Sequence, residues 1–518
     1  MKKSFLQLSA VIGIYLIAAL YKLSEIPGEW YGDITALQSQ VSEILKGSFP
    51  LGFLLGSGPL YPYFAAVFVK FLGVSYMTYK VATVSAGAVG LTLTYAYARE
   101  LGGRRLAVVS GILLSVSSWY LAWARLGSTP VMATPVLSAG MMLCLLRYHR
   151  SGRVIWLGTG ALLSGLGLFT YPGAYFYPLT YLAAFVILRL RTLINIRTAK
   201  ELTVIALCLI PLITGFTRIV LSQPAQFLDK QGYLGAKLFP ALSQDSNVVA
   251  AKLAANAAKT WGSFLFTGDI IFRTNVPGSP HLDPVSGVLF FTGILILLIS
   301  RNQRKLVPFL IIPLLLIPVP SMSPALPDGE VPSITRTYGM LPFVVITAGI
   351  GILAAGEWVR KRTGKYHSQI VIGIIVITAA VFNLNKYFSQ YPKSLPNRNS
   401  PYGRIIADNI DTLQPEMPVY MPGCCWGEWG QPEVHGVYYV LKNKTGRENI
   451  ILDQYQLTCR EIDTANGALI ILDPGDKLKI GRFTYCFPGA AGQLHTDRYG
   501  QKVFYSLLVP PGIRGIDR

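Results

Sequence analysis

The stretch YGMLPFVVITAGIGILAAGEWVRKRTGK, residues 338–365, joins an apolar run of membrane length to a cluster of basic residues. A helix needs about 20 apolar residues to cross the hydrocarbon core, and residues 338–356 supply such a run. The run is followed closely by Arg360, Lys361, Arg362 and Lys365. Short cytoplasmic connections retain positive charge, so this pattern predicts a transmembrane helix that ends on the cytoplasmic side.

The same alternation repeats along a chain of 518 residues, of which 52% are hydrophobic. It predicts an α-helical polytopic membrane protein with about 11 transmembrane helices. The expected spans are 6–23, 79–98, 105–123, 130–147, 154–170, 174–190, 202–221, 284–300, 306–320, 338–356 and 368–385. A further apolar stretch, 59–73, is short and contains Pro62 and Lys70. We expect it to lie in the membrane interface as an amphipathic helix.

Basic residues set the expected orientation. The other clusters are Lys2-Lys3, Arg99/Arg104/Arg105, Arg147/Arg150/Arg153, Arg189/Arg191/Arg197/Lys200 and Arg301/Arg304/Lys305. The connections on the opposite side contain few Lys or Arg, so the N-terminus should be cytoplasmic and the C-terminus extracytoplasmic. The first apolar run lacks a small-residue cleavage site and is interpreted as an uncleaved anchor. We therefore predict a multi-pass protein of the plasma membrane.

The net charge of +20 does not indicate a nucleic-acid partner. Much of this charge lies beside spans, where it would meet anionic cytoplasmic lipid, and the polar region after residue 385 is nearly balanced. The chain contains no GxxxxGK[ST], HExxH or GxSxG motif. No charged residue is convincingly placed at mid-membrane, where transport sites are expected. Membrane lipids are the partners that the charge pattern favours.

A second domain begins where the composition changes to YPKSLPNRNSPYG, residues 391–403. We predict a transmembrane domain over 1–390 and a small extracytoplasmic α/β domain over 391–518. In the second domain, YGRIIADNIDTL is typical of a helix. The segments PVYM, NIILD, ALIILD and KVFYSLLV are typical of buried strands.

The predicted C-terminal domain contains four cysteines, namely Cys424, Cys425, Cys459 and Cys486. Disulfides are permitted outside the cytoplasm, and four cysteines allow three pairings among which the sequence does not choose. A zinc site that includes His435 is the weaker alternative, because the adjacent Cys424-Cys425 lacks the usual spacing of zinc ligands.

Asp33 is the candidate catalytic residue. It lies shortly after the first span and follows Trp30, Tyr31 and Gly32. A carboxylate among aromatic residues at a membrane surface can be desolvated, which raises its pKa and suits it to accept a proton from a hydroxyl group. The alternative is an ordinary solvated loop acid. Candidates for a supporting role are Glu29, Asp269 and Asn275.

Three arginines lie near predicted outer mouths of spans, namely Arg336, Arg273 and Arg125. Arginine makes bidentate contacts with phosphate, so these residues are candidates for binding the phosphate of a lipid carrier. The alternative is that they only contact lipid headgroups with their charged ends.

Four stretches of the chain resemble a known class of enzymes. They are IPGEWYGDITALQSQVSEILKGSFP (26–50) with GPLYPYFAAVFVKFLGVS (58–75), YARELGGRRLAVVSGILLSVSSWYLAWARLG (97–127), LSGLGLFTYPGAYFYPL (163–179), and GDIIFRTNVPGSPHLDPVSGVLFFTGI (268–294) with VPSITRTYGMLP (331–342). The chain is similar to the GT-C class of membrane glycosyltransferases, in the branch with protein O-mannosyltransferases and the aminoarabinose transferase of lipid A. The order of the stretches is more specific than any one of them.

This resemblance implies a catalytic acid in the first external loop, at the position of Asp33. It also implies a polyprenyl- or dolichyl-phosphate sugar donor and a protein, lipid or glycan acceptor. Two departures matter: Ile34 follows Asp33 where the family usually has a second acid, and Ser57-Gly58 replaces an Arg-Glu pair. They leave open the divalent metal ion that the second acid would help to bind, and no other cofactor is expected.

The predicted function is transfer of a sugar from a lipid-phosphate donor to an acceptor on the extracytoplasmic face. The alternatives are a transporter or flippase of lipid-linked sugars and a non-catalytic membrane scaffold.

Overall fold

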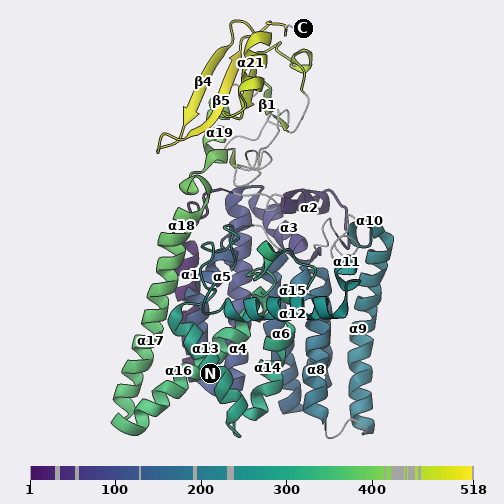
Figure 1. Cartoon of the computed structure of the whole chain (residues 1–518), viewed down its shortest axis with the longest axis vertical. Coiled ribbons are helices and arrows are strands. Elements are labelled where there is room, and N and C mark those ends of the chain that lie inside the picture. The colour runs from purple at the N-terminus through teal and green to yellow at the C-terminus, as the bar shows by residue number, and fades with distance from the viewer. Residues whose placement is uncertain are drawn as a thin grey trace. The chain divides into compact units, whose positions relative to one another are not determined.

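The computed structural model describes residues 2–29, 36–52, 58–127, 130–190, 195–229, 238–413, 416–421, 437, 440–441, 450–452 and 457–515. The chain divides into two compact units (Figure 1). One, the helical unit, comprises residues 1–23, 40–71 and 79–391. The second unit comprises residues 24–39, 72–78 and 392–518, so it includes two parts of the predicted first external loop.

Helices account for most of the chain up to residue 391. They are α1 (Lys2–Leu20), α2 (Ala36–Leu45), α3 (Leu60–Leu72), α4 (Tyr76–Val116), α5 (Ser118–Ala124), α6 (Ala133–Ser151), α7 (Val154–Leu166), α8 (Tyr177–Arg189), α9 (Ile196–Ser222), α10 (Pro224–Phe227), α11 (Phe239–Leu242), α12 (Ser246–Gly262), α13 (Pro284–Ile299), α14 (Val307–Leu316), α15 (Val319–Met322), α16 (Leu341–Thr363) and α17 (Lys365–Asn385). Each of the eleven predicted spans overlaps one of these helices, and the predicted helical fold class is confirmed.

Six helical segments among the described residues are long and apolar enough to cross a membrane by length and composition. They are Tyr76–Val116, Pro130–Ser151, Ile196–Ser222, Arg304–Met322, Tyr338–Thr363 and Lys365–Ser394. Four shorter apolar helices accompany them, at Ser4–Leu20, Leu60–Leu72, Val154–Phe169 and Pro284–Ile299. The protein is a multi-pass membrane protein.

Glycine divides α4 at the predicted boundary between two spans. Gly102 and Gly103 have non-helical backbone angles inside α4, and Gly103 has a φ of 80°. Glycine adopts this left-handed conformation without the steric penalty of a side chain. A second break precedes α5, where the Ser117 hydroxyl accepts a hydrogen bond from the Tyr120 N–H at 3.4 Å and caps the helix.

The predicted interfacial stretch forms α3, which has two different faces. Tyr61, Ala65 and Val69 are buried, whereas Val67 and Phe71 are exposed. These residues recur at helical spacing, so one face of α3 is buried in the protein and the other is exposed. The exposed Val67 and Phe71 are themselves apolar, and a position in the membrane interface stays a prediction.

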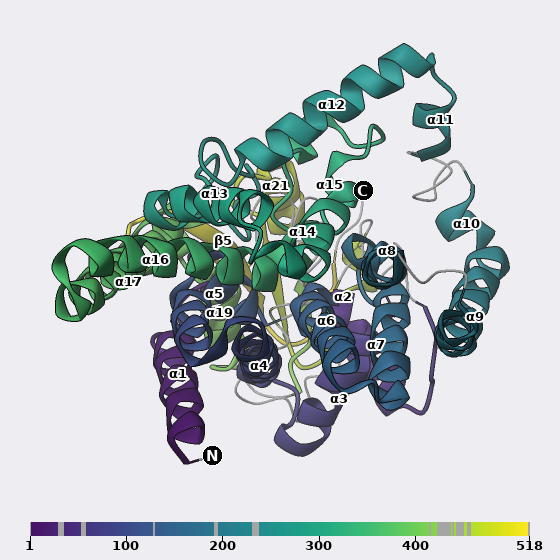
Figure 2. The same ribbon diagram turned by 90° about the horizontal axis from the view of Figure 1, so that it is seen from below.

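The described residues of the long connection between α9 and α13, where the sequence indicated only a loop, include three helices, α10, α11 and α12. The longest, α12, runs across the direction of α4 and α9, as Figures 1 and 2 both show. Its Asn256 side chain donates hydrogen bonds to the carbonyls of Met322, at 3.4 Å, and Ser323, at 2.9 Å. The connection is therefore joined to the end of α15.

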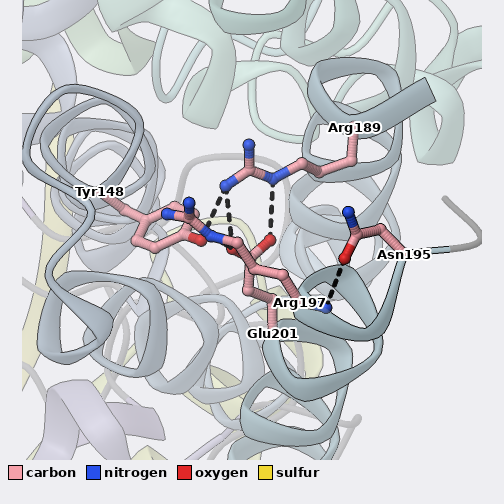
Figure 3. A network of polar contacts seen from close by, with 5 residues as sticks. All are labelled: Tyr148, Arg189, Asn195, Arg197 and Glu201. Carbon is pink, nitrogen blue, oxygen red and sulfur yellow. Dashed lines mark hydrogen bonds and ion pairs between the residues drawn. The ribbon is translucent and has the colours of Figure 1, made fainter. Parts of the chain in front are cut away.

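The C-terminus of α8 and the N-terminus of α9 meet in a polar network (Figure 3). The Arg189 guanidinium donates two hydrogen bonds to the Glu201 carboxylate, at 2.8 and 2.9 Å, and one to the Tyr148 hydroxyl at 2.9 Å. Arg197 adds a third hydrogen bond to Glu201 at 3.1 Å. Arg189 and Arg197 belong to one of the predicted basic clusters. We call the end of the helical unit that carries Arg147, Arg150, Arg189 and Arg197, together with Glu100 and Glu201, the basic end.

The described residues of the second unit form a five-stranded mixed sheet in the order β2-β1-β3-β5-β4. Its strands are β1 (Val419–Met421), β2 (Ile450–Leu452), β3 (Ala468–Leu472), β4 (Ala491–Thr496) and β5 (Lys502–Val509), and its longer helices are α19 (Tyr402–Ile410) and α21 (Lys477–Cys486). The predicted helix and all four predicted strands are present as α19, β1, β2, β3 and β5.

Apolar residues cover both faces of this sheet. Ile406 and Ile410 of α19 pack with Ile471 and Phe504 on one side. On the other side, Ile470 and Leu507 pack with Phe483 of α21. A disulfide joins Cys459 to Cys486, which selects one of the pairings that the sequence left open. Cys424, Cys425 and His435 lie outside the described residues.

Candidate functional site

The predicted catalytic acid, Asp33, lies outside the described residues, but the chain that leads into it is described. The buried Glu29 carboxylate accepts a hydrogen bond from the Gly403 N–H at the start of α19. A carboxylate at this end of a helix is stabilised by the helix dipole. A Cβ at position 403 would lie 2.8 Å from Glu29 Oε2, so any larger residue there would require the Glu29 carboxylate to shift. Glu29 therefore binds the start of α19, a contact that its position in the sequence did not indicate.

Asn399 also forms hydrogen bonds with the segment that precedes Asp33. Its Oδ1 accepts a hydrogen bond from the Gly28 N–H at 2.6 Å, and its amide donates one to the Glu25 carbonyl at 2.7 Å. The Arg404 guanidinium also donates to the Ser24 carbonyl at 3.3 Å. The second unit thus fixes the chain that precedes Asp33.

Asp269 joins two loops of the helical unit. Its side chain is buried, and its two oxygens accept hydrogen bonds from the Ile271 N–H at 2.7 Å and the Ile334 N–H at 2.8 Å. Burial raises the pKa of this carboxyl to about 6, although the two backbone hydrogen bonds and the nearby Arg336 act in the opposite direction. Asp269 consequently couples the loop before α13 to the loop before α16.

Asn275 shapes the first of these loops. Its side-chain amide donates hydrogen bonds to the carbonyls of Asp269, at 2.9 Å, and Ser279, at 2.8 Å. Arg273, the second predicted phosphate-binding residue, lies between Asp269 and Asn275 and is partly buried. Its carbonyl accepts a hydrogen bond from the Tyr391 hydroxyl. Three of the predicted residues therefore lie in one ordered loop.

Arg336 lies in the loop that Asp269 contacts. Its guanidinium pairs with the Glu330 carboxylate at 2.6 Å, and 11% of the Arg336 side chain is exposed. A phosphate that approached Arg336 would have to compete with the Glu330 carboxylate for the guanidinium, because both groups are anions. Glu330 was not among the predicted residues, and its position six residues before Arg336 gave no signal of this pairing.

Arg125 has a different environment. It is fully buried, and its guanidinium donates hydrogen bonds to the carbonyls of Ala18, at 2.6 Å, and Lys22, at 3.0 Å. It also lies 5.0 Å from the ring centres of both Tyr387 and Phe388. Arginine bound to the last carbonyls of a helix complements the negative end of its dipole. Arg125 thus fastens the C-terminus of α1.

His281 and Trp119 are further site residues that the sequence did not single out. His281 is buried; its Nδ1 lies 3.1 Å from the Ser263 hydroxyl, and its Nε2 accepts a hydrogen bond from the Asp269 N–H at 3.4 Å. Burial lowers the pKa of His281 to about 3, so its ring is neutral near pH 7. The Trp119 ring lies against His281, and its Nε1 donates to the Ile334 carbonyl at 3.1 Å. Both side chains add to the contact that Asp269 makes between the loop before α13 and the loop before α16, and we call this contact the Asp269 joint.

Two glycines connect further loops to this joint. A Cβ at Gly173 would lie 2.9 Å from the Arg336 carbonyl oxygen, and one at Gly58 would lie 1.9 Å from the Phe169 carbonyl carbon. The Gly58 N–H also donates to the Thr170 carbonyl at 2.5 Å. The close approach at Gly58 leaves no room for a side chain at this position. We call the connections over residues 167–176, 263–283 and 323–340 the loop end.

The geometry gives no support for a metal ion in the described part of the chain. No three His, Cys, Asp or Glu side chains come together there. Asp269 accepts two backbone hydrogen bonds and Glu330 pairs with Arg336, so neither is arranged as a metal ligand. A metal ion that involves Asp33 stays a prediction.

Comparisons with known proteins agree with this architecture. Residues 56–215 match the family described as dolichyl-phosphate-mannose-protein mannosyltransferase. No curated protein sequence matches. The structure is similar to ArnT from Cupriavidus metallidurans bound to undecaprenyl phosphate, with a TM-score of 0.58, 11% identity and coverage of 99% of each chain.

Two other solved structures extend this comparison. ArnT in its apo state has a TM-score of 0.55 and 12% identity, over 98% of this chain and 99% of that one. The oligosaccharyltransferase of Archaeoglobus fulgidus, in complex with zinc and sulfate, has a TM-score of 0.50 and 10% identity, over 96% of this chain and 72% of that one. The predicted resemblance to the GT-C class is confirmed by the family match and the shared fold.

Proposed function

We propose that this chain, which has the fold of the GT-C membrane glycosyltransferases, transfers a sugar from a polyprenyl- or dolichyl-phosphate donor to an acceptor hydroxyl on the extracytoplasmic face. The observation that carries the proposal is the combination of two matches. One is the mannosyltransferase family over 56–215, and the other is whole-chain similarity to a structure that holds undecaprenyl phosphate. The acceptor belongs to the broad class of proteins, lipids and glycans.

In this mechanism Asp33 is the general base. It takes the proton of the acceptor hydroxyl as the acceptor oxygen forms a bond to the anomeric carbon of the sugar. The bond from that carbon to the phosphate oxygen breaks, and its electron pair leaves with the lipid phosphate. Arginine stabilises the charge that develops on this leaving group.

Arg336 and Arg273 are the proposed phosphate-binding residues. Both lie in loops that the Asp269 carboxylate and the Asn275 amide hold in place. Arg336 is already paired with Glu330, so the donor phosphate would compete with that carboxylate for the guanidinium. Arg125 has a weaker claim, because its hydrogen bonds run to the end of α1.

The test is donor turnover by the purified full-length protein. Incubation with a polyprenyl-phosphate sugar and candidate acceptors, with and without divalent metal ions, should release free polyprenyl phosphate. Donor binding without release under every condition would instead favour a transporter or flippase of lipid-linked sugars. Absence of donor binding would favour a scaffold.

We also infer the orientation, with the basic end in the cytoplasm and the plasma membrane as the location. Ser151, at the end of α6, and Ser243, after α11, are both exposed and are suited to labelling after substitution by cysteine. A membrane-impermeant maleimide added to intact cells should label Ser243→Cys and spare Ser151→Cys. The reverse pattern would invert the orientation and remove the chemistry from the extracytoplasmic face.

A further inference from the structure

A groove of about 810 Å³ lies at the basic end, between α1, α4 and α6. Its lining includes Ser4 and Phe5 from the start of α1, Tyr95 and Arg99 from α4, and Arg147 and Arg150 from the end of α6. Pockets of a few hundred to a thousand Å³ accommodate small organic ligands. None of these residues belongs to the loop end described above.

The groove carries an excess of positive charge. Its three arginines face one acid, Glu100, which pairs with Arg147 at 2.7 Å and lies 4.0 Å from Arg150. Arg150 also donates a hydrogen bond to the Glu100 carbonyl. Arg99 is exposed at the groove. One carboxylate cannot neutralise three guanidinium groups, so the groove favours an anion.

Two buried hydroxyl groups point to a ligand independently of this charge. Tyr95 is 2% exposed and Ser4 is 4% exposed, and both line the groove. Within the part of the chain that the structure describes, the hydroxyl oxygens of both side chains have no hydrogen-bond partner. A buried polar group without a partner costs about 1–3 kcal/mol, so such groups are normally satisfied by protein, water or ligand.

Apolar surface beside the groove indicates what kind of anion it takes. Phe5, in its wall, is 74% exposed, and the neighbouring Leu6 is 71% exposed. On a membrane-spanning helix such side chains face lipid. A soluble anion would have no use for this apolar border, whereas the acyl chains of a lipid would cover it.

We propose that this groove binds the headgroup of an anionic phospholipid. The lipid phosphate lies against Arg99 and Arg150, and its ester or headgroup oxygens accept hydrogen bonds from Tyr95 and Ser4. Basic pockets between transmembrane helices at the cytoplasmic side are suited to such headgroups. The site is separate from the donor site and does not depend on the proposed glycosyl transfer.

Native mass spectrometry of the detergent-purified full chain tests the proposal. The protein is titrated with phosphatidylglycerol and, separately, with phosphatidylcholine of the same acyl chains. We expect binding of phosphatidylglycerol to be about tenfold tighter, because its net negative charge is attracted by the arginines, whereas the choline ammonium of phosphatidylcholine offsets its phosphate and is repelled by them. Equal binding of the two lipids by the wild-type protein would overturn the proposal.

Variants locate the site. Arg99→Gln with Arg150→Gln should abolish the preference, because it leaves Arg147 to neutralise Glu100. The matched control is Arg301→Gln with Lys305→Gln, which removes two exposed charges outside the groove. This control should keep the preference. Loss of the preference in the control alone would place the lipid elsewhere and contradict the proposal.

Tyr95→Phe supplies a milder variant that keeps the ring and removes only the unpartnered hydroxyl. It should weaken phosphatidylglycerol binding about threefold to tenfold, as expected for one lost hydrogen bond, with an unchanged melting temperature in lipid-free detergent. Unchanged affinity would contradict the proposed hydroxyl contact. Glycerol 3-phosphate should not compete at equal concentration; effective competition would show that the groove takes a soluble phosphate and overturn the lipid assignment.

Discussion

The two ends of the helical unit use the same charged residue types in different ways. At the basic end, arginine side chains bind the buried acid, since Arg189 and Arg197 both donate to Glu201 (Figure 3). At the loop end, backbone N–H groups bind the buried acid, since Asp269 accepts from Ile271 and Ile334. The first arrangement neutralises charge between helices. The second ties loop backbones together, so removing that acid should disturb two loops that hold the candidate arginines.

The largest expected effect concerns Asp33. Asp33→Asn keeps the size of the side chain and removes its basic carboxylate. A general base contributes about 10²–10⁴-fold, or roughly 3–5 kcal/mol of barrier, so turnover should fall at least a hundredfold. Donor binding should change little. Retained turnover in this variant would mean that another residue is the base.

Arg336→Ala should instead weaken donor binding, by about tenfold or more, because hydrogen bonds to charged groups contribute roughly 1.5–3 kcal/mol. Glu330→Gln is the informative partner variant, since it removes the competing anion and keeps Arg336. It should leave donor affinity unchanged or improve it. Unchanged affinity in Arg336→Ala, measured with a labelled donor, would count against the phosphate role.

Asp269→Asn should destabilise the loop end by about 1–3 kcal/mol, because one amide oxygen cannot replace two carboxylate oxygens and a backbone N–H loses its partner. The control is Asp328→Asn, which alters an exposed acid in a nearby connection and should be neutral. The melting temperatures of the two purified variants give the comparison. Equal melting temperatures would contradict the role of Asp269 as a joint.

The pH dependence of this difference follows from the raised pKa of Asp269, about 6 in the folded protein. The unfolded chain has the lower, ordinary value, so the folded protein binds the extra proton between about pH 4 and 6. Stability from this group is greatest at low pH and is lost as the pH rises through 6. The difference in melting temperature between the wild-type protein and Asp269→Asn should therefore become smaller from pH 4 to pH 7.

The smallest effect is expected at the basic end. Arg197 is largely exposed, and Arg189 retains two hydrogen bonds to Glu201 without it. Arg197→Gln should change stability by less than about 0.5 kcal/mol, as is usual for an exposed ion pair, and should leave turnover unchanged. A large loss of turnover in Arg197→Gln would mean that the two ends are not functionally distinct.

The sequence predicted the helices well because apolar length and flanking charge are local properties. The boundary between residues 98 and 105 coincides with Gly102-Gly103, and residues 59–73 form α3. It did not predict α12, whose polar and alanine-rich sequence lies in a long connection and carries no membrane signal. Cysteine pairing also needed the fold, because the choice of Cys459 with Cys486 depends on where α21 lies.

The site was only partly predictable, because partners distant in sequence decide the role of each residue. Asp269 and Asn275 were singled out, but the link from Asp269 to Ile334 spans 65 residues. Arg125 was chosen for its place near an outer mouth, yet its guanidinium contacts carbonyls of α1. Composition and spacing do not contain such contacts.

The central claim is that the donor phosphate binds at the loop end. Its most direct test is a photoreactive polyprenyl-phosphate analogue that carries its reactive group beside the phosphate, used with excess phosphatidylglycerol to occupy the groove at the basic end. After irradiation, mass spectrometry of the digested protein locates the label. We predict labelled peptides from residues 268–284 or 331–342. Labelling confined to α1, α4 and α6 at the basic end would contradict the account.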